Sequence, residues 1–279
     1  SCYGGTCKLL VAKQGLLATG SYHSCITRGT KAYCWGDNSL CQLGTGSPLP
    51  SSKVVTVSHN YSGQLVALSA GQNHTMALTS GALSVGWGDD AFGQLDLCGI
   101  GGSSCHPQAS GETGVVSVAA TGLVHSCVAL VGGAVRCWGK NTDHQIGYGV
   151  KDSMMSCDYV GAHTLSQIDE VVDVTAGSYF SCAVRADGTV WCWGDNSHGQ
   201  LGNGACCTDT KVPQDVGLES VSSIDGGNYH VCSAKGDGTL WCWGDNGSGQ
   251  LGIGNDMEQH APIQVPSLEG VIGVTCGAY

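Results

Sequence analysis

A repeat of about 51 residues runs through this chain and constrains its fold more than any other sequence feature. Each copy carries a Trp-Gly pair, an Asx residue and a segment similar to Gly-Gln-Leu. The tryptophans of the five copies, 50 to 55 residues apart, are Trp35, Trp87, Trp138, Trp193 and Trp243. A second anchor, Gly-x-x-His or Gly-x-x-Phe, ends about 12 residues before each tryptophan, and a sixth such anchor begins at Gly277. A fixed period of this length indicates a repeat architecture in which each copy forms one structural unit.

Within each unit the apolar residues alternate with a period of two, which predicts β-strands. The segments 115–119 and 171–175 are short and rich in β-branched residues. The segments 181–184 and 189–192 flank an Asp-Gly turn, which predicts a hairpin. A looser run then ends in a fourth apolar stretch. We therefore predict an all-β protein, a single β-propeller domain over residues 1–279 whose four-stranded blades take about 51 residues each.

The two anchors also set the expected unit boundaries. Five full units span roughly 16–65, 66–115, 116–170, 171–220 and 221–270, and a partial unit spans 271–279. Their signatures, G-x-x-H-[ST]-x-A-L and W-G-x-N-x-x-G-Q-L-G, run from about Leu16 to Tyr279 and resemble the regulator of chromosome condensation repeat family. This resemblance implies a propeller, most often one with seven blades.

Five full blades and an incomplete one are expected here. They form either a smaller closed ring or part of a seven-bladed ring that a longer chain completes, and the end in mid-unit favours the longer chain. Well-known members of the family act as exchange factors for a small nuclear GTPase and bind chromatin, but the cysteine pairs described below and the acidic charge of this chain argue against that role here. Other relatives on this scaffold plug the active site of an enzyme.

Eight of the 17 cysteines occur as four pairs at matching points on both strands of a hairpin, which predicts disulfides across the hairpins. The pairs are Cys25 and Cys34, Cys127 and Cys137, Cys182 and Cys192, and Cys232 and Cys242. In the second unit both cysteines are replaced together, by Met76 and Gly86, as expected if the two positions are bonded. Directly opposed residues of a hairpin lie about 4.5–5.5 Å apart, which is within reach of a disulfide.

The other nine cysteines carry weaker signals. Cys98 and Cys105 would close a small loop, and Cys157 could join Cys206 or Cys207 between neighbouring units. Because the total is odd, at least one cysteine is free or pairs outside this chain, and Cys276 is the candidate.

The disulfides predict an oxidising compartment, either outside a cell or in a secretory lumen. Asn60, Asn73 and Asn246 each begin an N-x-[ST] sequon and are candidate glycosylation sites in such a setting. Asn60 lies in a polar loop, whereas the other two lie inside repeat signatures. We therefore expect a secreted or cell-surface glycoprotein.

Charge and hydropathy argue against two kinds of partner. The chain has 11 basic and 22 acidic residues, and its formal charge of −11 argues against nucleic-acid binding. An uncharged stretch, 113–135, is long enough to cross a bilayer, but it contains four glycines and several polar residues. We interpret it as buried strands and expect no membrane insertion.

The histidines and aspartates do not predict a catalytic or metal site. Four of the ten histidines occupy one repeat position, and the fourth unit has Phe180 there, which favours a packing role. A recurring aspartate resembles a calcium ladder, but Lys140 takes its place in the third unit. Asx residues beside tight turns usually bind local backbone donors instead. We predict no enzyme, no catalytic residue, no metal and no cofactor.

Function is expected where the repeat is broken, because the equivalent loops of a propeller gather on one face. The irregular segments follow the Gln-Leu signatures, at 92–111, 148–164 and 205–210. The candidate partner-binding residues are Phe92, Asp96, His106, Tyr148, Met154, Met155 and Tyr159. We predict a non-enzymatic scaffold that binds a protein partner through this face.

Three alternatives stay open. The chain could be a structural subunit of an extracellular filament or surface assembly, joined by its odd cysteine or incomplete blade. It could bind a glycan through a row of aromatic residues, Tyr33, Trp191 and Trp241. The family resemblance also implies a secreted enzyme inhibitor.

Overall fold

The computed structural model describes residues 2–3, 6–7, 17–58, 63–97, 102–120, 122–149 and 163–278. These residues form 22 strands and no helix, as the period-two pattern predicted. Accordingly, the described ranges include no helix with the length and apolar character needed to cross a bilayer. The uncharged stretch 113–135 forms β11 and β12, so the strand interpretation of this stretch is confirmed.

Twenty of the strands form five four-stranded antiparallel sheets, here called blades one to five. In each blade the strands follow one another in chain order. Blade one contains β3 (Leu17–Thr19), β4 (His23–Arg28), β5 (Lys31–Gly36) and β6 (Ser51–Thr56); blade two contains β7 (Leu65–Ala70), β8 (His74–Thr79), β9 (Leu83–Asp89) and β10 (Ser103–Thr113). Blade three contains β11 (Val115–Ala119), β12 (His125–Leu130), β13 (Val135–Gly139) and β14 (His163–Thr164). Blade four contains β15 (Val171–Ala176), β16 (Phe180–Arg185), β17 (Val190–Gly194) and β18 (Thr210–Asp215); blade five contains β19 (Val221–Gly226), β20 (His230–Lys235), β21 (Leu240–Gly244) and β22 (Gln259–Gln264). A small hairpin of β1 (Cys2–Tyr3) and β2 (Thr6–Cys7) precedes them.

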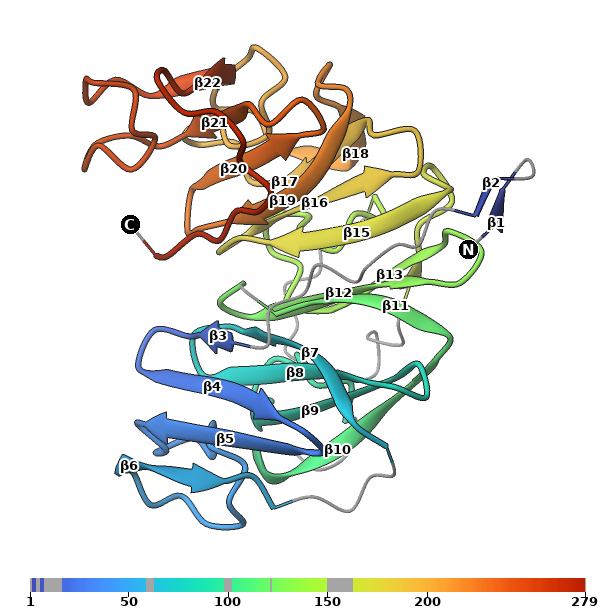
Figure 1. Cartoon of the computed structure of the whole chain (residues 1–279), viewed down its shortest axis with the longest axis vertical. Helices are drawn as coiled ribbons and strands as arrows, with labels where there is room; N and C mark the ends of the chain where they lie inside the picture. Colours follow the sequence, from blue (N-terminus) through green and yellow to red (C-terminus); the bar gives the residue numbers. More distant parts are fainter. Residues whose placement is uncertain are drawn as a thin grey trace.

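The blades are arranged around a common centre (Figure 1), which confirms the predicted propeller. Each blade turns its first strand toward this hub, where the Gly-x-x-His turns converge. A Cβ at Gly71 would collide with the backbone carbonyls of Ala120 and Gly122 in the next blade, and Gly122 meets the carbonyl of Gly177 in the same way. At these positions of the Gly-x-x-His anchor only glycine fits, because a neighbouring backbone occupies the space of a side chain.

Residues 271–278 occupy the place of a sixth first strand. The Val274 amide donates to Ser223 Oγ (3.3 Å), and the Cys276 amide donates to Asp225 Oδ2 (2.8 Å). The same kind of bond joins blades three and four, where the Val174 amide donates to Ser117 Oγ. This segment therefore packs on blade five as one blade packs on the next.

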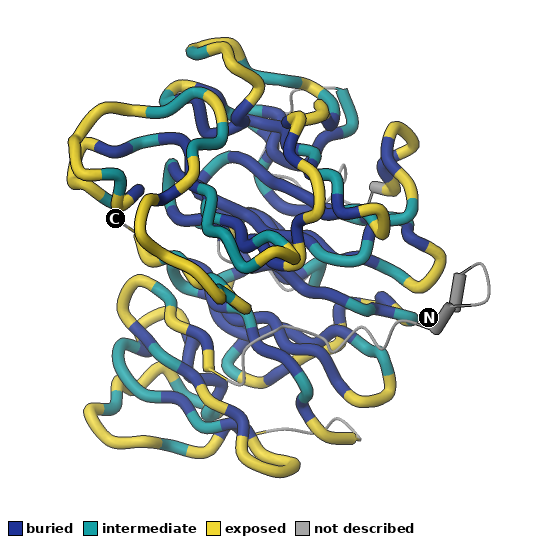
Figure 2. The backbone as a smooth tube through the Cα atoms, turned by 45° about the horizontal axis from the view of Figure 1, so that its top comes forward, coloured by how far each residue is buried: buried dark blue, intermediate teal, exposed yellow. Residues whose placement is uncertain are grey.

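The apolar core lies between the blades rather than within one sheet. Buried residues follow the central strands, while many residues of the loops at the ends are exposed (Figure 2). Four tryptophans, all fully buried, each donate their indole N–H to a backbone carbonyl of the preceding blade. These bonds are Trp87 to Gln42 (2.9 Å), Trp138 to Gln94 (3.0 Å), Trp193 to Gln145 (2.9 Å) and Trp243 to Gln200 (2.9 Å). Losing a buried aromatic side chain of this kind typically costs about 3–5 kcal/mol, so these contacts are a major source of stability.

A histidine relay crosses the same interfaces. His23 Nε2 lies 2.8 Å from Thr75 Oγ1, and the corresponding His74–Ser126 and His125–Ser181 distances are 3.1 and 2.8 Å. Ser126 and Ser181 donate their hydroxyl protons to the carbonyls of Gln94 and Gln145, so these hydroxyls accept from the imidazole Nε2–H. Each of these series of hydrogen bonds thus connects a histidine, a hydroxyl group, a backbone carbonyl and a tryptophan from two neighbouring blades.

Blade four shows which residues depend on one another in this relay. Phe180 replaces the histidine, and Val231 in blade five replaces the hydroxyl residue. Both lie in one buried cluster with Trp243. The polar pair is therefore exchanged as a unit for an apolar pair, which leaves no buried hydroxyl without its donor.

Burial keeps the relay histidines neutral. It lowers the pKa of His23 to about 4 and that of His74 and His125 to about 3, and it also lowers the pKa of His230. The cause is the cost of placing an imidazolium charge in a low-dielectric interior. These histidines are structural, in agreement with their place in the repeat.

Each of the four predicted hairpin cysteine pairs forms a disulfide between directly opposed strand residues, with a Cα–Cα distance of 4.1 Å. In blade two, Met76 and Gly86 are also directly opposed. A Cβ at Gly86 would collide with Met76 Sδ, so the methionine fills the space that the disulfide takes elsewhere. The paired loss of the two cysteines thus has a direct packing explanation.

Candidate functional site

One end of the propeller collects two turns from each blade and is here called the loop face. It consists of the turns at 20–22, 71–73, 122–124, 177–179 and 227–229 and the loops at 37–50, 89–97, 140–149, 195–209 and 245–258. Backbone bonds join the two elements, for example from the Asp195 amide to the Tyr179 carbonyl (3.0 Å) and from Asp245 to Tyr229 (2.9 Å). The hairpin turns, such as 28–31, lie at the opposite end of the strands.

The side chains of the repeated Asp-Asn and Gln residues hold these loops in shape by hydrogen bonds within each loop. In blade four, Asp195 accepts bonds from the Ser197 amide (3.0 Å) and from Gln200 Nε2 (2.7 Å). Asn196 is buried and its Oδ1 accepts from the Leu201 amide (3.1 Å). The recurring aspartate therefore binds local backbone and side-chain donors, as Asx residues at turns usually do.

Half-buried aromatic and cationic side chains from four successive blades lie on the loop face. Lys140 Nζ of blade three lies 5.3 Å from the centre of the Phe92 ring of blade two and 5.6 Å from that of Tyr179 of blade four. The ring centres of His198 and Tyr229, from blades four and five, are 5.0 Å apart. We call these five residues the aromatic row. Such amphipathic side chains supply contact area together with polar atoms, as protein-binding surfaces require.

Two disulfides brace the loop face. Cys41 of blade one bonds to Cys105 of β10 in blade two, with a Cα–Cα distance of 4.5 Å. The predicted Cys98–Cys105 bond is therefore wrong, and Cys98 itself lies outside the described residues. The prediction failed because β10 runs back beside the loop of blade one, where the Gly46 amide donates to the Cys105 carbonyl (2.8 Å).

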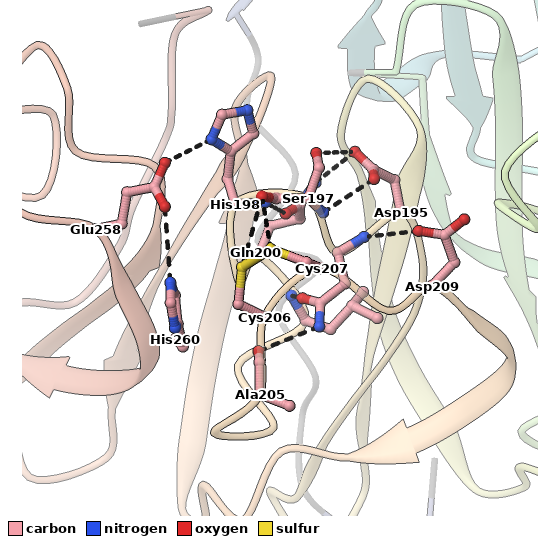
Figure 3. The surroundings of a disulfide bond; sticks show 12 residues. Asp195, Ser197, His198, Gln200, Ala205, Cys206, Cys207, Asp209, Glu258 and His260 are labelled. Atoms are coloured by element: carbon pink, nitrogen blue, oxygen red, sulfur yellow. Dashed lines mark hydrogen bonds and ion pairs between the residues drawn. A yellow bond between two sulfur atoms is a disulfide. The ribbon is translucent and has the colours of Figure 1, made fainter.

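The second brace joins the neighbours Cys206 and Cys207 (Figure 3). The prediction that one of them pairs with Cys157 is therefore wrong, and Cys157 lies outside the described residues. Each of the two sulfur atoms lies 3.7 Å from the Ser197 carbonyl oxygen, and the Cys207 amide donates to the Asn196 carbonyl (2.8 Å). The disulfide thus holds the outer part of the blade-four loop against its inner turn.

Beside this disulfide, two histidines and a glutamate meet across the boundary between blades four and five (Figure 3). His198 Nδ1 lies 2.6 Å from Glu258 Oε1, and His260 Nε2 lies 3.6 Å from Glu258 Oε2. Sequence reasoning missed this cluster. The repeat gave no signal for it, because this position differs in every unit: Leu40, Phe92, Asp143, His198 and Ser248.

The predicted partner-binding residues occupy different environments. Phe92 belongs to the aromatic row, and His106 is exposed beside Gly46 of blade one. Tyr148 packs on the buried cluster between blades three and four. Asp96 is half-buried, and its burial, together with the nearby Glu112 and Asp90 carboxylates, raises its pKa to about 7. Met154, Met155 and Tyr159 lie outside the described residues.

The predicted glycosylation and glycan-binding residues also differ in their surroundings. Asn246 is fully buried, and its Nδ2 donates to the carbonyls of Asn255 (2.8 Å) and Met257 (3.1 Å), so the fold excludes it as a glycan acceptor. Asn73 is half-buried, and Asn60 lies outside the described residues. Trp191 and Trp241, two of the residues considered for glycan binding, pack against the buried clusters between blades, which favours a packing role.

The geometry defines a β-propeller whose blades are joined by recurring Trp–Gln and His–hydroxyl contacts. Two family models, both described as the regulator of chromosome condensation (RCC1) repeat, match this chain. One matches residues 65–94, 115–145, 171–200 and 221–250, and the other matches 31–78, 187–234 and 237–279. Together they cover most of the sequence, and the chain belongs to this family.

Relatives by sequence include the human E3 ubiquitin-protein ligase HERC2, 30% identical over 67% of this chain and 4% of that protein. The ultraviolet-B receptor UVR8 of Arabidopsis thaliana is 27% identical over 72% of this chain and 46% of that protein. This chain therefore matches only a small part of HERC2 and less than half of UVR8.

Solved structures that share the fold include two with TM-scores of 0.80 or more. The crystal structure of human WBSCR16 has a TM-score of 0.81, with 24% identity over 94% of this chain and 69% of that chain. Prp20p from Saccharomyces cerevisiae has a TM-score of 0.80, with 20% identity over 94% of this chain and 67% of that chain.

Proposed function

We propose that this chain is a non-enzymatic scaffold that binds a protein partner through its loop face. The observation that carries the proposal is the aromatic row, in which Phe92, Lys140 and Tyr179 from three successive blades lie within cation–π distance. These side chains are half-exposed, and each lies close to the end of a strand of its blade, which fixes its position. A preorganised surface of this kind loses little conformational entropy on binding.

Two further observations support a binding role rather than catalysis. The relay histidines are neutral and engaged between blades, and the recurring aspartates are engaged inside the loops. HERC2 is named as a ligase, but the region matched here is a small part of that protein. We therefore assign the ligase activity of that relative to none of the residues of this chain.

We propose an extracellular or secretory-lumen location for the scaffold. The support is the six disulfides among the described residues, since such bonds persist in oxidising compartments. Alkylation of the protein from its native source before and after reduction, read by mass spectrometry, tests this proposal. Blocking of the paired cysteines before reduction would refute it.

Charge reversal tests the binding face. The change Lys140→Glu removes both cation–π contacts and should weaken binding of a partner found by a screen of secreted and cell-surface proteins at least tenfold. The matched control is Lys31→Glu, an exposed charge reversal in the hairpin turn at the opposite end of the strands. Affinities measured by biolayer interferometry should be unchanged for the control. Equal losses in both variants, or none in Lys140→Glu, would refute the assignment of the loop face.

A further inference from the structure

Three side chains of metal-binding chemistry meet on the loop face between blades four and five. His198 comes from the loop of blade four, and Asp245 and Glu258 come from the loop of blade five. One ligand atom of each lies within 4.8 Å of the other two. We propose that these residues bind a divalent cation of the zinc class. The described residues contain no second group of this kind.

The fold positions the blade-four ligand before any ion arrives. The His198 backbone amide donates to Gln200 Oε1 (2.8 Å), which fixes the turn that carries the side chain. Its ring lies against the Tyr229 ring of blade five, with the centroids 5.0 Å apart. Nδ1 then points at Glu258 Oε1, 2.6 Å away (Figure 3). The imidazole is therefore held at the blade boundary with one ring nitrogen facing the carboxylates.

The blade-five ligands are held by the repeat itself. Asp245 accepts from the Gly247 amide (2.9 Å) and from Gln250 Nε2 (2.7 Å), which fixes the carboxylate plane and leaves further lone pairs for an ion. Outer hydrogen bonds of this kind orient metal ligands.

Glu258 is brought to the boundary by the start of β22. There the His260 carbonyl accepts from the Gly204 amide of blade four (2.8 Å), which binds the two blades beside the cluster. His260 Nε2 lies 3.6 Å from Glu258 Oε2 and so helps to orient that carboxylate. We assign His260 as a positioning residue rather than a ligand.

The donor set selects the ion. Calcium and magnesium prefer oxygen ligands alone, whereas imidazole nitrogen combined with carboxylate oxygen suits zinc. The two carboxylates offset the charge of a divalent ion. In tetrahedral zinc sites the ligand atoms lie about 3.3 Å apart, given metal–ligand distances of about 2.0 Å. The three ligand atoms now lie within 4.8 Å of one another. Rotation of the partly exposed His198 and Glu258 side chains brings them to the shorter spacing of a zinc site, and water completes the coordination.

Isothermal titration calorimetry with zinc chloride tests the proposal. The protein is stripped with a chelator at pH 7.5 with its disulfides intact, and calcium chloride is titrated in a parallel experiment. We expect binding of zinc at micromolar or lower concentration and at least tenfold weaker binding of calcium. His198→Ala and Glu258→Gln should each weaken zinc binding at least tenfold. The control His106→Ala removes an exposed histidine of β10, outside the cluster, and should bind zinc as the wild type does.

A second measurement separates loss of the site from loss of the fold. Zinc should raise the melting temperature of the wild type and of His106→Ala, but not that of Glu258→Gln. Without zinc, Glu258→Gln should melt as the wild type does, because the residue is exposed. Three results would overturn the proposal: no zinc binding at 100 µM, unchanged zinc binding in His198→Ala and Glu258→Gln, or preference for calcium.

Discussion

The buried histidine relay predicts a specific acid sensitivity that one double substitution should reduce. His125 is fully buried, and burial lowers its pKa from 6.5 to about 3. In the unfolded chain the same imidazole takes up a proton as the pH falls below about 6.5, whereas in the folded chain it does not. Protonation therefore favours the unfolded state progressively from pH 6.5 downward, until the pH reaches the folded-state pKa.

The size of the effect follows from the two pKa values. Between pH 7.5 and pH 5.0, the unfolded-state imidazole gains about 2 kcal/mol from protonation, and the folded-state imidazole gains almost nothing. This difference depends little on the folded-state pKa, which lies well below pH 5.0. His23 and His74 add similar amounts, so the three histidines should together remove about 6 kcal/mol of stability over this range.

The interface between blades four and five suggests a double substitution that the fold tolerates. Replacing His125 by Phe and Ser181 by Val copies the Phe180–Val231 pair of the next interface. The Gln145 carbonyl loses the Ser181 hydroxyl but keeps the Trp193 indole donor, just as Gln200 is bonded by Trp243. The double variant should therefore fold.

Urea denaturation followed by tryptophan fluorescence, with disulfides intact, gives the free energy of unfolding at pH 7.5 and 5.0. The double variant should lose about 2 kcal/mol less than the wild type between these two pH values. The control His106→Phe changes an exposed histidine and should keep the full wild-type loss. The same loss in the double variant and the wild type would refute the assignment of a buried neutral imidazole.

Three further predictions concern packing and thiol chemistry. The double variant Cys182→Met and Cys192→Gly copies the Met76–Gly86 pair of blade two. Its free energy of unfolding, measured by urea denaturation, should be about 2–3 kcal/mol lower than that of the wild type. An unchanged free energy would show that the disulfide does not restrict the unfolded chain. Gly71→Ala should lower the melting temperature, because its Cβ meets backbone carbonyls of the next blade, and the free-energy cost should be about 1–3 kcal/mol. Gly81→Ala is the control, because Gly81 likewise has no positive φ and its Cβ would meet only Thr79 Oγ1, at 3.8 Å; equal losses would contradict the steric explanation. Burial and the nearby Asp225 carboxylate raise the pKa of the Cys276 thiol far above its usual range, so iodoacetamide at pH 8 should modify it much more slowly in the folded than in the urea-unfolded protein; equal rates would contradict this.

The fold was accessible from the sequence because its information is local and repeated. Alternation of apolar residues gave the strands, and the Asp-Gly turns gave the hairpins. The Cys182–Cys192 spacing placed both residues symmetrically about one turn, so their contact depended on hairpin register alone.

The loop-face contacts were not accessible in the same way. Cys41 and Cys105 are 64 residues apart and lie in different blades, so no hairpin register brings them together. His198 and Glu258 are 60 residues apart, and their contact depends on how one loop leans toward the next. Within a repeat protein the regular positions reveal the scaffold, while contacts between irregular loops require the three-dimensional arrangement of neighbouring units.

The relay contacts between blades leave a correlation in the sequence. The residue after the anchor is Thr75, Ser126 or Ser181 where the preceding unit has histidine, and it is Val231 where that unit has Phe180. This correlation between adjacent copies identifies which faces touch. It could have predicted the interface contacts from one sequence.

The Trp–Gln contact has a mechanical consequence. Each blade is held chiefly by its two neighbours, so a pulling force applied to the ends should detach blades one after another rather than all at once. The hairpin disulfides of blades one, three, four and five would then keep these released blades partly looped and shorten the length gained when each of them detaches. A stretched molecule of this kind would yield in a series of small, similar increments and would absorb work before it failed.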